Sequence, residues 1–237
     1  MNKFLTELVE GFFGLFYPKL CLGCGENLQI GNDLICATCQ IYMPQTHLHE
    51  LRENEFTQKF AGRLPIETGA ALFYYSKNLF TRQLVHHLKY YDKPEVGVQI
   101  GRIYGEILKK SPNFRGIELV VPVPLHPKKE WQRGYNQAAK FGAGLAESLG
   151  VEQAEHAIRR IEHRESQTRK RRHDRHDNAR QLYEVADAKK LAGRHVLLVD
   201  DVLTTGATLE NCGKYIAELP GTRISMATIA MGKKGII

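Results

Sequence analysis

The residues most suited to chemistry are two adjacent acids, Asp200 and Asp201, which follow a run of four aliphatic residues at 196–199. Such a run predicts a strand buried on both faces, as in the middle of a parallel sheet. Ligands of open α/β sheets bind at the carboxyl ends of the strands. Two carboxylates at that edge could therefore accept hydrogen bonds from the hydroxyl groups of a diol.

A hydroxyl-rich stretch at 204–208 follows the acids and leads into apolar residues at helical spacing. Gly206 permits an unusual backbone angle there, and the amides at a helix N-terminus form an anion site. The stretch thus offers N–H and O–H donors to a phosphate beside two carboxylates for a diol, which suits a ribose 5-phosphate. The alternative is that the acids and threonines simply cap the helix, because both are good N-cap residues.

Four cysteines near the amino terminus form two C-x-x-C pairs separated by eleven residues: Cys21, Cys24, Cys36 and Cys39. Four thiolates complete a closed tetrahedral shell around one zinc ion, so a structural zinc is expected; a redox dithiol is the alternative for a single pair. Beside four cysteines, His47 and His49 are not expected to be ligands. The remaining cysteine, Cys212, is predicted to be a core thiol.

Length and composition suit one substantial domain plus a small one, since the chain has 237 residues. Its 33 Lys and Arg against 26 acids give a net charge of +7, which favours anionic partners such as phosphates or nucleic acid. No apolar run reaches the roughly 18 residues of a membrane span. The first residues predict an amphipathic helix that ends before Pro18, and its acids, Glu7 and Glu10, argue against a secretory segment. A reducing, cytoplasmic location is therefore expected.

Strands and helices alternate through the remainder of the chain. Strands are expected at 66–75, 117–123, 156–163, 182–185, 196–199 and 223–230, and helices near 79–89, 96–109, 138–149 and after 208. This alternation predicts a mainly parallel sheet flanked by helices. Residues 44–65 are polar and predict a linker or an extended connection. The chain is accordingly divided into 1–65, with the amphipathic helix, the four-cysteine module and the linker, and a second domain at 66–237.

A basic segment at 159–180 holds nine Lys or Arg against four acids, with no apolar side chain between Ile161 and Ala179. Such a segment cannot bury itself. It is either a solvated loop or a lid that closes over an anion.

The acids and the residues through 208 resemble the binding loop for phosphoribosyl pyrophosphate (PRPP) of type I phosphoribosyltransferases. More of the chain resembles the ComF family, which is associated with DNA uptake and the use of external DNA. The stretches that carry this resemblance are 21–39, 89–90, 121–126, 133–137, 167, 175, 178 and 200–208. The chain departs from the family at Lys128 and Lys129, where arginine is common, and at Lys170, where an aliphatic residue is usual. Lysine keeps the charge but lacks the planar fork that grips phosphate.

The resemblance implies an α/β fold of the type I phosphoribosyltransferase kind with a small zinc-binding module. It implies PRPP as donor, Mg2+ bound with it, and a nitrogen acceptor such as a nucleobase. It assigns the ribose hydroxyls to Asp200 and Asp201. The other residues it assigns to PRPP are Val202, Leu203, Thr204, Thr205, Gly206, Ala207 and Thr208. Those assigned to the pyrophosphate side and the lid are Lys89, Leu125, His126, Lys128, Arg133, Gln167, Arg175 and Asn178; Arg175 joins the two acids as a catalytic residue.

The sequence leaves two classes of function open. The first is a phosphoribosyltransferase that acts on a nitrogen acceptor. The second is a binding module that senses PRPP or engages single-stranded DNA, while the zinc module recruits a partner such as a helicase of the DNA-uptake machinery.

Overall fold

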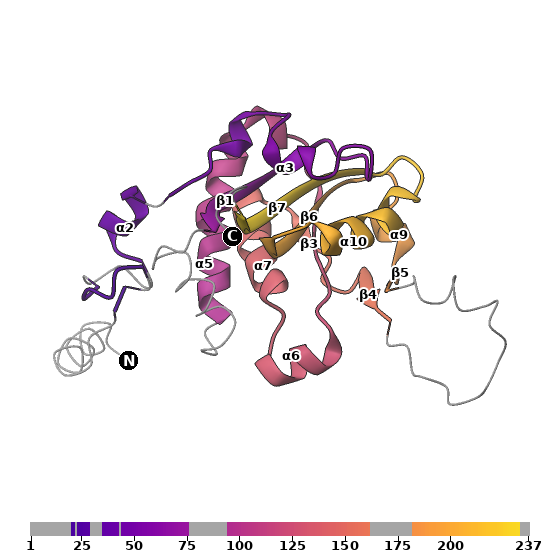
Figure 1. Ribbon diagram of the computed structural model, residues 1–237. Coiled ribbons are helices and arrows are strands. Elements are labelled where there is room, and N and C mark those ends of the chain that lie inside the picture. Colours follow the sequence, from indigo (N-terminus) through magenta and orange to yellow (C-terminus); the bar gives the residue numbers. More distant parts are fainter. Residues whose placement is uncertain are drawn as a thin grey trace.

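The computed structural model describes residues 20–21, 23–28, 35–42, 44–75, 94–161 and 182–232. Its centre is a five-stranded sheet with the order β1-β7-β6-β2-β3, in which every pair of neighbours is parallel (Figure 1). The strands are β1 (Thr68–Tyr75), β2 (Leu119–Pro122), β3 (Glu152–Gln153), β6 (His195–Leu203) and β7 (Arg223–Gly232). The expected parallel sheet is therefore confirmed.

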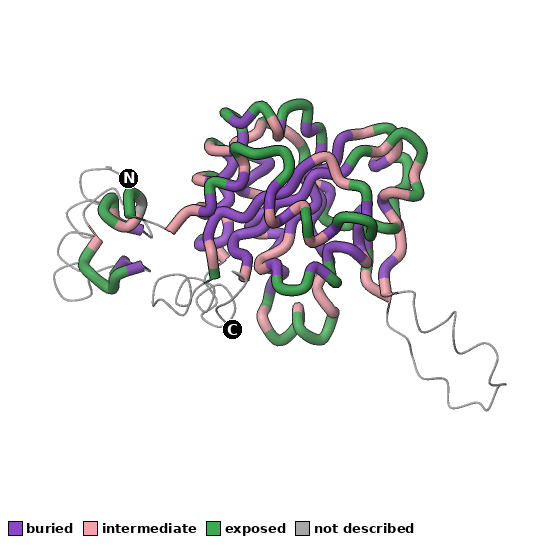
Figure 2. Tube along the Cα trace, turned by 45° about the horizontal axis from the view of Figure 1, so that its top comes forward, coloured by how far each residue is buried: buried purple, intermediate pink, exposed green. Residues whose placement is uncertain are grey.

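β6, the middle strand of the sheet, and its neighbour β7 are buried over most of their length. Residues 195–199 of β6 and 224–231 of β7 are all buried, which explains their continuous apolar character (Figure 2). β6 is longer than the expected 196–199, because its pairing with β7 continues through Asp200 to Leu203. The acid pair thus lies on the strand itself, near its carboxyl end.

Helices cover both faces of the sheet. Successive strand residues point to opposite faces, and Leu198 lies beside Gly213 of α10 (Ala207–Ala217) whereas Val199 lies beside Gly142 of α7 (Gln137–Leu149). α7 and α10 therefore pack on opposite faces. α5 (Pro94–Lys110) packs against α7, where the Tyr104 and Phe141 rings stack with centroids 6.4 Å apart.

The interpretation of residues 44–65 as a linker is wrong. This segment forms η1 (Leu48–Glu50) and α3 (Glu55–Gln58) and packs on the edge of β1, where the Thr46 N–H donates to the Leu72 carbonyl at 3.0 Å. Phe56 and Phe60 are fully buried. Their burial outweighs the polar composition of the segment, and it belongs with the sheet.

Shorter elements complete the described chain: α2 (Ala37–Tyr42), η2 (Pro112–Phe114), α6 (Pro127–Arg133), β4 (Ile158–Arg160), β5 (Tyr183–Val185) and α9 (Ala188–Leu191). β4 and β5 form a separate antiparallel pair, so two of the expected strands lie outside the main sheet. α6 and β3 were not predicted. Outside the described residues lie the amphipathic helix before Pro18, the helix expected near 79–89 with Lys89, and positions 162–180 of the basic segment, which include Gln167, Arg175 and Asn178.

Candidate functional site

The acid pair lies at the carboxyl edge of the sheet, as predicted. Asp200 and Asp201 are half-buried in β6, and the Asp201 N–H donates to Asp200 Oδ1 at 2.8 Å. Both acids line the same cleft although neighbouring strand residues alternate in direction. Two carboxylates therefore border one cavity.

The loop after β6, residues 204–208, is called the phosphate loop below. Its Thr204, Thr205 and Thr208 are exposed, whereas Gly206 is buried with a φ of 85°. Gly206 is the N-cap of α10 and supplies no side-chain cap. The N-cap residue is thus neither an acid nor a threonine, although Thr205 Oγ1 accepts from the Ala207 N–H of the first helical turn at 3.4 Å.

A cleft of about 450 Å³ opens at this edge. It brings together seven of the residues that the resemblance assigned, which are Leu125, Arg133, Asp200, Asp201, Val202, Thr204 and Thr208. Six others with described positions do not line it: His126, Lys128, Leu203, Thr205, Gly206 and Ala207. Leu203 is buried in the core. Two sides of the cleft therefore come from the phosphate loop and from the chain after β2.

Several lining residues were missed in the sequence: Tyr75, Lys129, Asn136, Gln137, Arg160 and Tyr183. For one of them a signal existed. Lys129 and Arg133 are four residues apart in α6 and so share one helix face, which lines the cleft. Lys128, which is exposed as Lys129 is, does not line it. The predicted cation Lys128 is thus replaced in the cleft by its neighbour. Arg160 and Tyr183 could not be found locally, because the pairing of β4 with β5 joins them.

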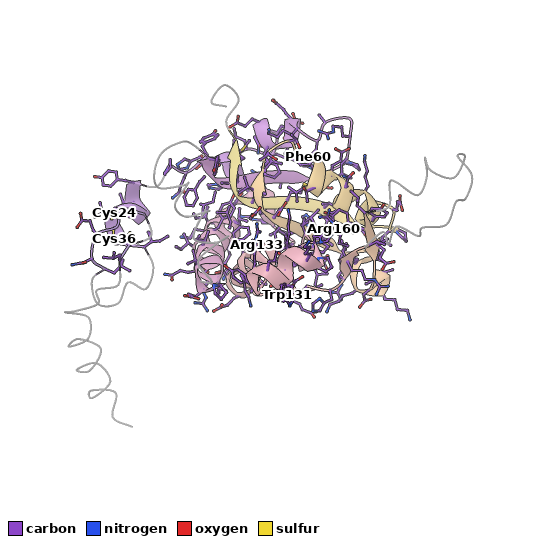
Figure 3. All side chains as sticks on the ribbon, turned by 60° about the horizontal axis from the view of Figure 1, so that its bottom comes forward. Cys24, Cys36, Phe60, Trp131, Arg133 and Arg160 are labelled. Atoms are coloured by element: carbon purple, nitrogen blue, oxygen red, sulfur yellow. The ribbon has the colours of Figure 1, made fainter. Side chains whose placement is uncertain are left out.

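Arg133 and Arg160, which are labelled in Figure 3, bring positive charge to the cleft, and Tyr183 lines it as well. The Arg133 guanidinium donates to Gln137 Oε1 at 2.9 Å, which ties the end of α6 to the start of α7. The Arg160 guanidinium lies 5.8 Å from the centroid of the Tyr183 ring. Burial raises the pKa of Tyr183 to about 12, so its hydroxyl stays protonated at neutral pH. The cleft is therefore lined by acids on β6 and by cations facing them.

α6 projects from the body of the protein beside this cleft (Figure 1). Its N-cap is His126, whose Nδ1 accepts from the Lys128 N–H at 3.2 Å, and none of its side chains is buried. Trp131, the single tryptophan of the chain, is 85% exposed on it. This helix thus carries both cleft cations and an unburied aromatic ring.

The four predicted cysteines converge: all four Sγ atoms of Cys21, Cys24, Cys36 and Cys39 lie within 4.8 Å of one another. The Cys24 and Cys36 sulfurs are 3.8 Å apart, and a tetrahedron with Zn–S bonds of about 2.3 Å has edges of about 3.8 Å. These residues could therefore hold a zinc ion. His47 and His49 belong to a separate group with Glu50 and are not part of this cluster.

Backbone amides donate hydrogen bonds to one of the cysteine sulfurs. The N–H groups of Gly23 and Cys36 donate to Cys21 Sγ at 3.4 and 3.3 Å. Although burial opposes ionisation, these donors lower the pKa of the Cys21 thiol to about 6. A thiolate is the form that ligates a metal, so the chain favours the ligating state of this residue.

Comparison with known proteins agrees with this geometry. Residues 138–236 match the family described as the phosphoribosyl transferase domain. This part of the chain is therefore similar to a phosphoribosyl transferase domain. Competence protein F of Haemophilus influenzae is 25% identical over 215 residues, which are 86% of this chain and 93% of that protein. DNA utilization protein YhgH of Escherichia coli K12 is 27% identical over 217 residues, which are 85% of this chain and 92% of that protein.

The resemblance to the ComF family and the expected fold class are thereby confirmed, because relatives named for competence and for DNA utilization align along most of this chain and residues 138–236 match the phosphoribosyl transferase domain. Among solved structures, glutamine PRPP amidotransferase from B. subtilis aligns with a TM-score of 0.43 and 16% identity over 60% of this chain and 30% of that chain. Among the described residues, no helix combines the length and the apolar character needed to cross a bilayer.

Proposed function

We propose that the protein binds PRPP at the carboxyl edge of its sheet and transfers the phosphoribosyl group to a nitrogen acceptor, such as a nucleobase, in the uptake or use of DNA. The observation that carries this proposal is the cleft itself. Asp200 and Asp201 border one cavity with the phosphate loop on one side and with Lys129, Arg133 and Arg160 on the other. A diol, a 5'-phosphate and a pyrophosphate each find a complementary group there.

In this proposal, the chain accelerates transfer by positioning and by neutralising charge. Asp200 and Asp201 accept hydrogen bonds from the ribose hydroxyls, while the phosphate loop holds the 5'-phosphate. As the bond from C1 to pyrophosphate breaks and the bond to nitrogen forms, Lys129, Arg133 and Arg160 stabilise the departing pyrophosphate. The carboxylates are hard oxygen ligands of the kind that Mg2+ accepts, and bound Mg2+ would neutralise further charge on the leaving group.

The test is binding and turnover of PRPP with Mg2+, using the full chain and a panel of nucleobases as acceptors. Asp201→Asn is expected to keep the melting temperature and to weaken PRPP binding about ten-fold or more, because hydrogen bonds to charged groups contribute about 1.5–3 kcal/mol. Asp187→Asn is the matched control, since Asp187 caps α9 on the surface and asparagine caps equally well. Unchanged PRPP affinity in Asp201→Asn would refute the assignment.

A second candidate function is binding of single-stranded DNA, and the exposure of Trp131 beside Lys128 favours it. A base could stack on the indole while phosphates meet the lysine. Affinity for an oligonucleotide should then fall by about 0.7 log units per phosphate contact for each decade of salt. Trp131→Ala should weaken binding about ten-fold, whereas Tyr42→Ala, another exposed aromatic, should not. Equal losses of oligonucleotide affinity in the two variants would show that Trp131 is not a specific stacking site for a base.

We further propose that the four cysteines bind one structural zinc and that α2 presents a partner surface. Ile41 and Tyr42 are 74% and 80% exposed on this helix. Metal analysis should find about one zinc per chain, lost in Cys39→Ser and kept in Cys212→Ala, because Cys212 is buried in α10. Retention of zinc in Cys39→Ser would contradict a four-cysteine site.

A further inference from the structure

The phosphate loop is held from behind by the segment that follows α3. Lys59 Nζ donates to the Thr204 carbonyl at 2.8 Å, although the two residues are 145 positions apart in the chain. An ammonium group that donates to a carbonyl makes one of the stronger hydrogen bonds in a protein. Lys59 therefore fixes the backbone at the first residue of the loop.

Phe60 supports the middle of the loop. Its ring is fully buried, and two ring atoms lie 3.2 Å from the point where a β-carbon on Gly206 would stand. Gly206 has a φ of 85°, a conformation that L side chains rarely adopt. The ring thus occupies the space behind the glycine and leaves the loop little room to move toward the core.

Arg63 supports the end of the loop through Glu210, in the first turn of α10. Glu210 is 8% exposed and forms ion pairs with both Arg63 and Lys214. The Lys214 ammonium, together with the Arg63 guanidinium, holds the pKa of Glu210 below its ordinary value. A carboxylate at a helix N-terminus would oppose a bound phosphate, and these two cations offset that charge.

Residues 54–64, called the supporting segment below, are themselves anchored to the sheet. Asn54 caps α3 by accepting from the Phe56 and Thr57 amides, and its Nδ2 donates to the Gly69 carbonyl of β1 at 2.9 Å. The Tyr74 hydroxyl of β1 donates to Glu55. The backbone that carries Lys59 is therefore held in place by hydrogen bonds to β1.

We infer that Lys59, Phe60 and Arg63 are positioning residues that hold the phosphate loop in its phosphate-binding conformation before a ligand arrives. This inference rests on the proposed function, in which residues 204–208 bind the 5'-phosphate. It assigns a role in ligand binding to a segment that lies far from the loop in sequence and contacts it at Thr204 and Gly206.

The test uses the zinc-loaded full chain with two probes, ribose 5-phosphate and pyrophosphate with Mg2+. Lys59→Met should weaken ribose 5-phosphate binding about ten-fold and change pyrophosphate affinity less than about two-fold. Lys59→Arg, which keeps a donor, should restore most of the lost affinity. Arg52→Met is the matched control, because Arg52 forms an exposed ion pair with Glu67 on the same segment without touching the loop. If Lys59→Met disrupted the fold in general, the affinities for ribose 5-phosphate and for pyrophosphate would both fall.

Hydrogen exchange at the amides of 204–208 in the ligand-free protein provides a second readout. Lys59→Met should raise exchange there, and Arg52→Met should not. Unchanged exchange and unchanged ribose 5-phosphate affinity in Lys59→Met would overturn the inference. If the natural chain failed to bind ribose 5-phosphate while Lys59→Met still raised exchange, the positioning role would stand and the proposed function would fall.

Discussion

Two loops border the cleft, and they are built in opposite ways. The phosphate loop follows β6 and is supported by Lys59 and Phe60, whereas the chain after β2 forms α6, in which no side chain is buried. Figure 3 shows Phe60 and Trp131 on opposite sides of Arg133 and Arg160. One large aromatic ring is fully buried behind its loop and the other is 85% exposed on its helix.

The difference follows from the groups that each loop offers. The phosphate loop presents hydroxyls and amides, which bind an anion only at short range and in good alignment, so its backbone must be fixed. α6 presents the cations Lys129 and Arg133, whose charge acts over a longer distance and whose long side chains can adjust. We therefore expect changes behind the phosphate loop to affect stability and binding, and changes on α6 to affect mainly binding.

The largest expected effect is on stability. Phe60→Ala should lower the free energy of unfolding by about 3–5 kcal/mol, because it empties a fully buried site. Trp131→Ala should stay within about 0.5 kcal/mol, because its ring is exposed. Urea unfolding of both variants measures this difference. Similar losses of unfolding free energy in the two variants would contradict the expected difference between the two loops.

A smaller effect is expected at Gly206. Gly206→Ala forces an L residue to adopt a φ of 85° and places a methyl group 3.2 Å from Phe60, at a cost of about 1–3 kcal/mol. Gly150→Ala is the control, since Gly150 has a φ of 71° at the end of α7 with open space around it. Only Gly206→Ala should also lose affinity for ribose 5-phosphate. If the two variants had equal unfolding free energies and equal affinities for ribose 5-phosphate, the phosphate loop would have no special role.

On α6, the expected effect is on pyrophosphate binding. Lys129→Met and Arg133→Met should each weaken it about ten-fold, by loss of a charge-assisted hydrogen bond; the melting temperature should stay unchanged in Lys129→Met and fall in Arg133→Met, which also loses the hydrogen bond to Gln137. Lys128→Met should have little effect, because Lys128 does not line the cleft. Calorimetric titration with pyrophosphate and Mg2+ separates the three variants. A larger effect of Lys128 than of Lys129 would reverse the assignment made from the helix face.

The smallest expected effect concerns pH, at the opposite end of the strand that carries the acids. His195 begins β6, and its Nε2 lies 2.8 Å from Ser225 Oγ. Burial, and then the Arg223 charge, lower its pKa below the ordinary value near 6.5 despite Glu67 and Glu118. Its contribution to stability is therefore complete above pH 6.5 and is lost as the pH falls toward the folded-state pKa.

Unfolding free energies at pH 7.5 and 5.5 measure this effect. The loss on acidification should be smaller in His195→Gln than in the natural chain, because glutamine does not titrate. An equal loss in both proteins would show that other groups control the acid sensitivity. Such a result would not change the comparison of the two loops, because His195 lies at the amino edge of the sheet and the loops lie at the carboxyl edge.

Much of the candidate site could be predicted because its signals are local. The aliphatic run, the acid pair and the glycine of the loop occupy adjacent positions, and the cysteine pairs carry their spacing with them. The supporting segment was missed because its polar composition conceals Phe56, Phe60 and Leu64, which recur every four residues and are all buried. That spacing was the available signal for helical packing.

The sequence by itself determined the parallel α/β sheet, the position of Asp200 and Asp201 at its carboxyl edge and the four-cysteine cluster, because each depends on residues close together in the chain. Only the tertiary structure decided that Lys129 faces the cleft in place of Lys128, that Arg160 and Tyr183 join it, and that Lys59 holds Thr204. Those facts depend on helix phase and on contacts between distant segments. They become visible only when burial of apolar side chains has brought the segments together.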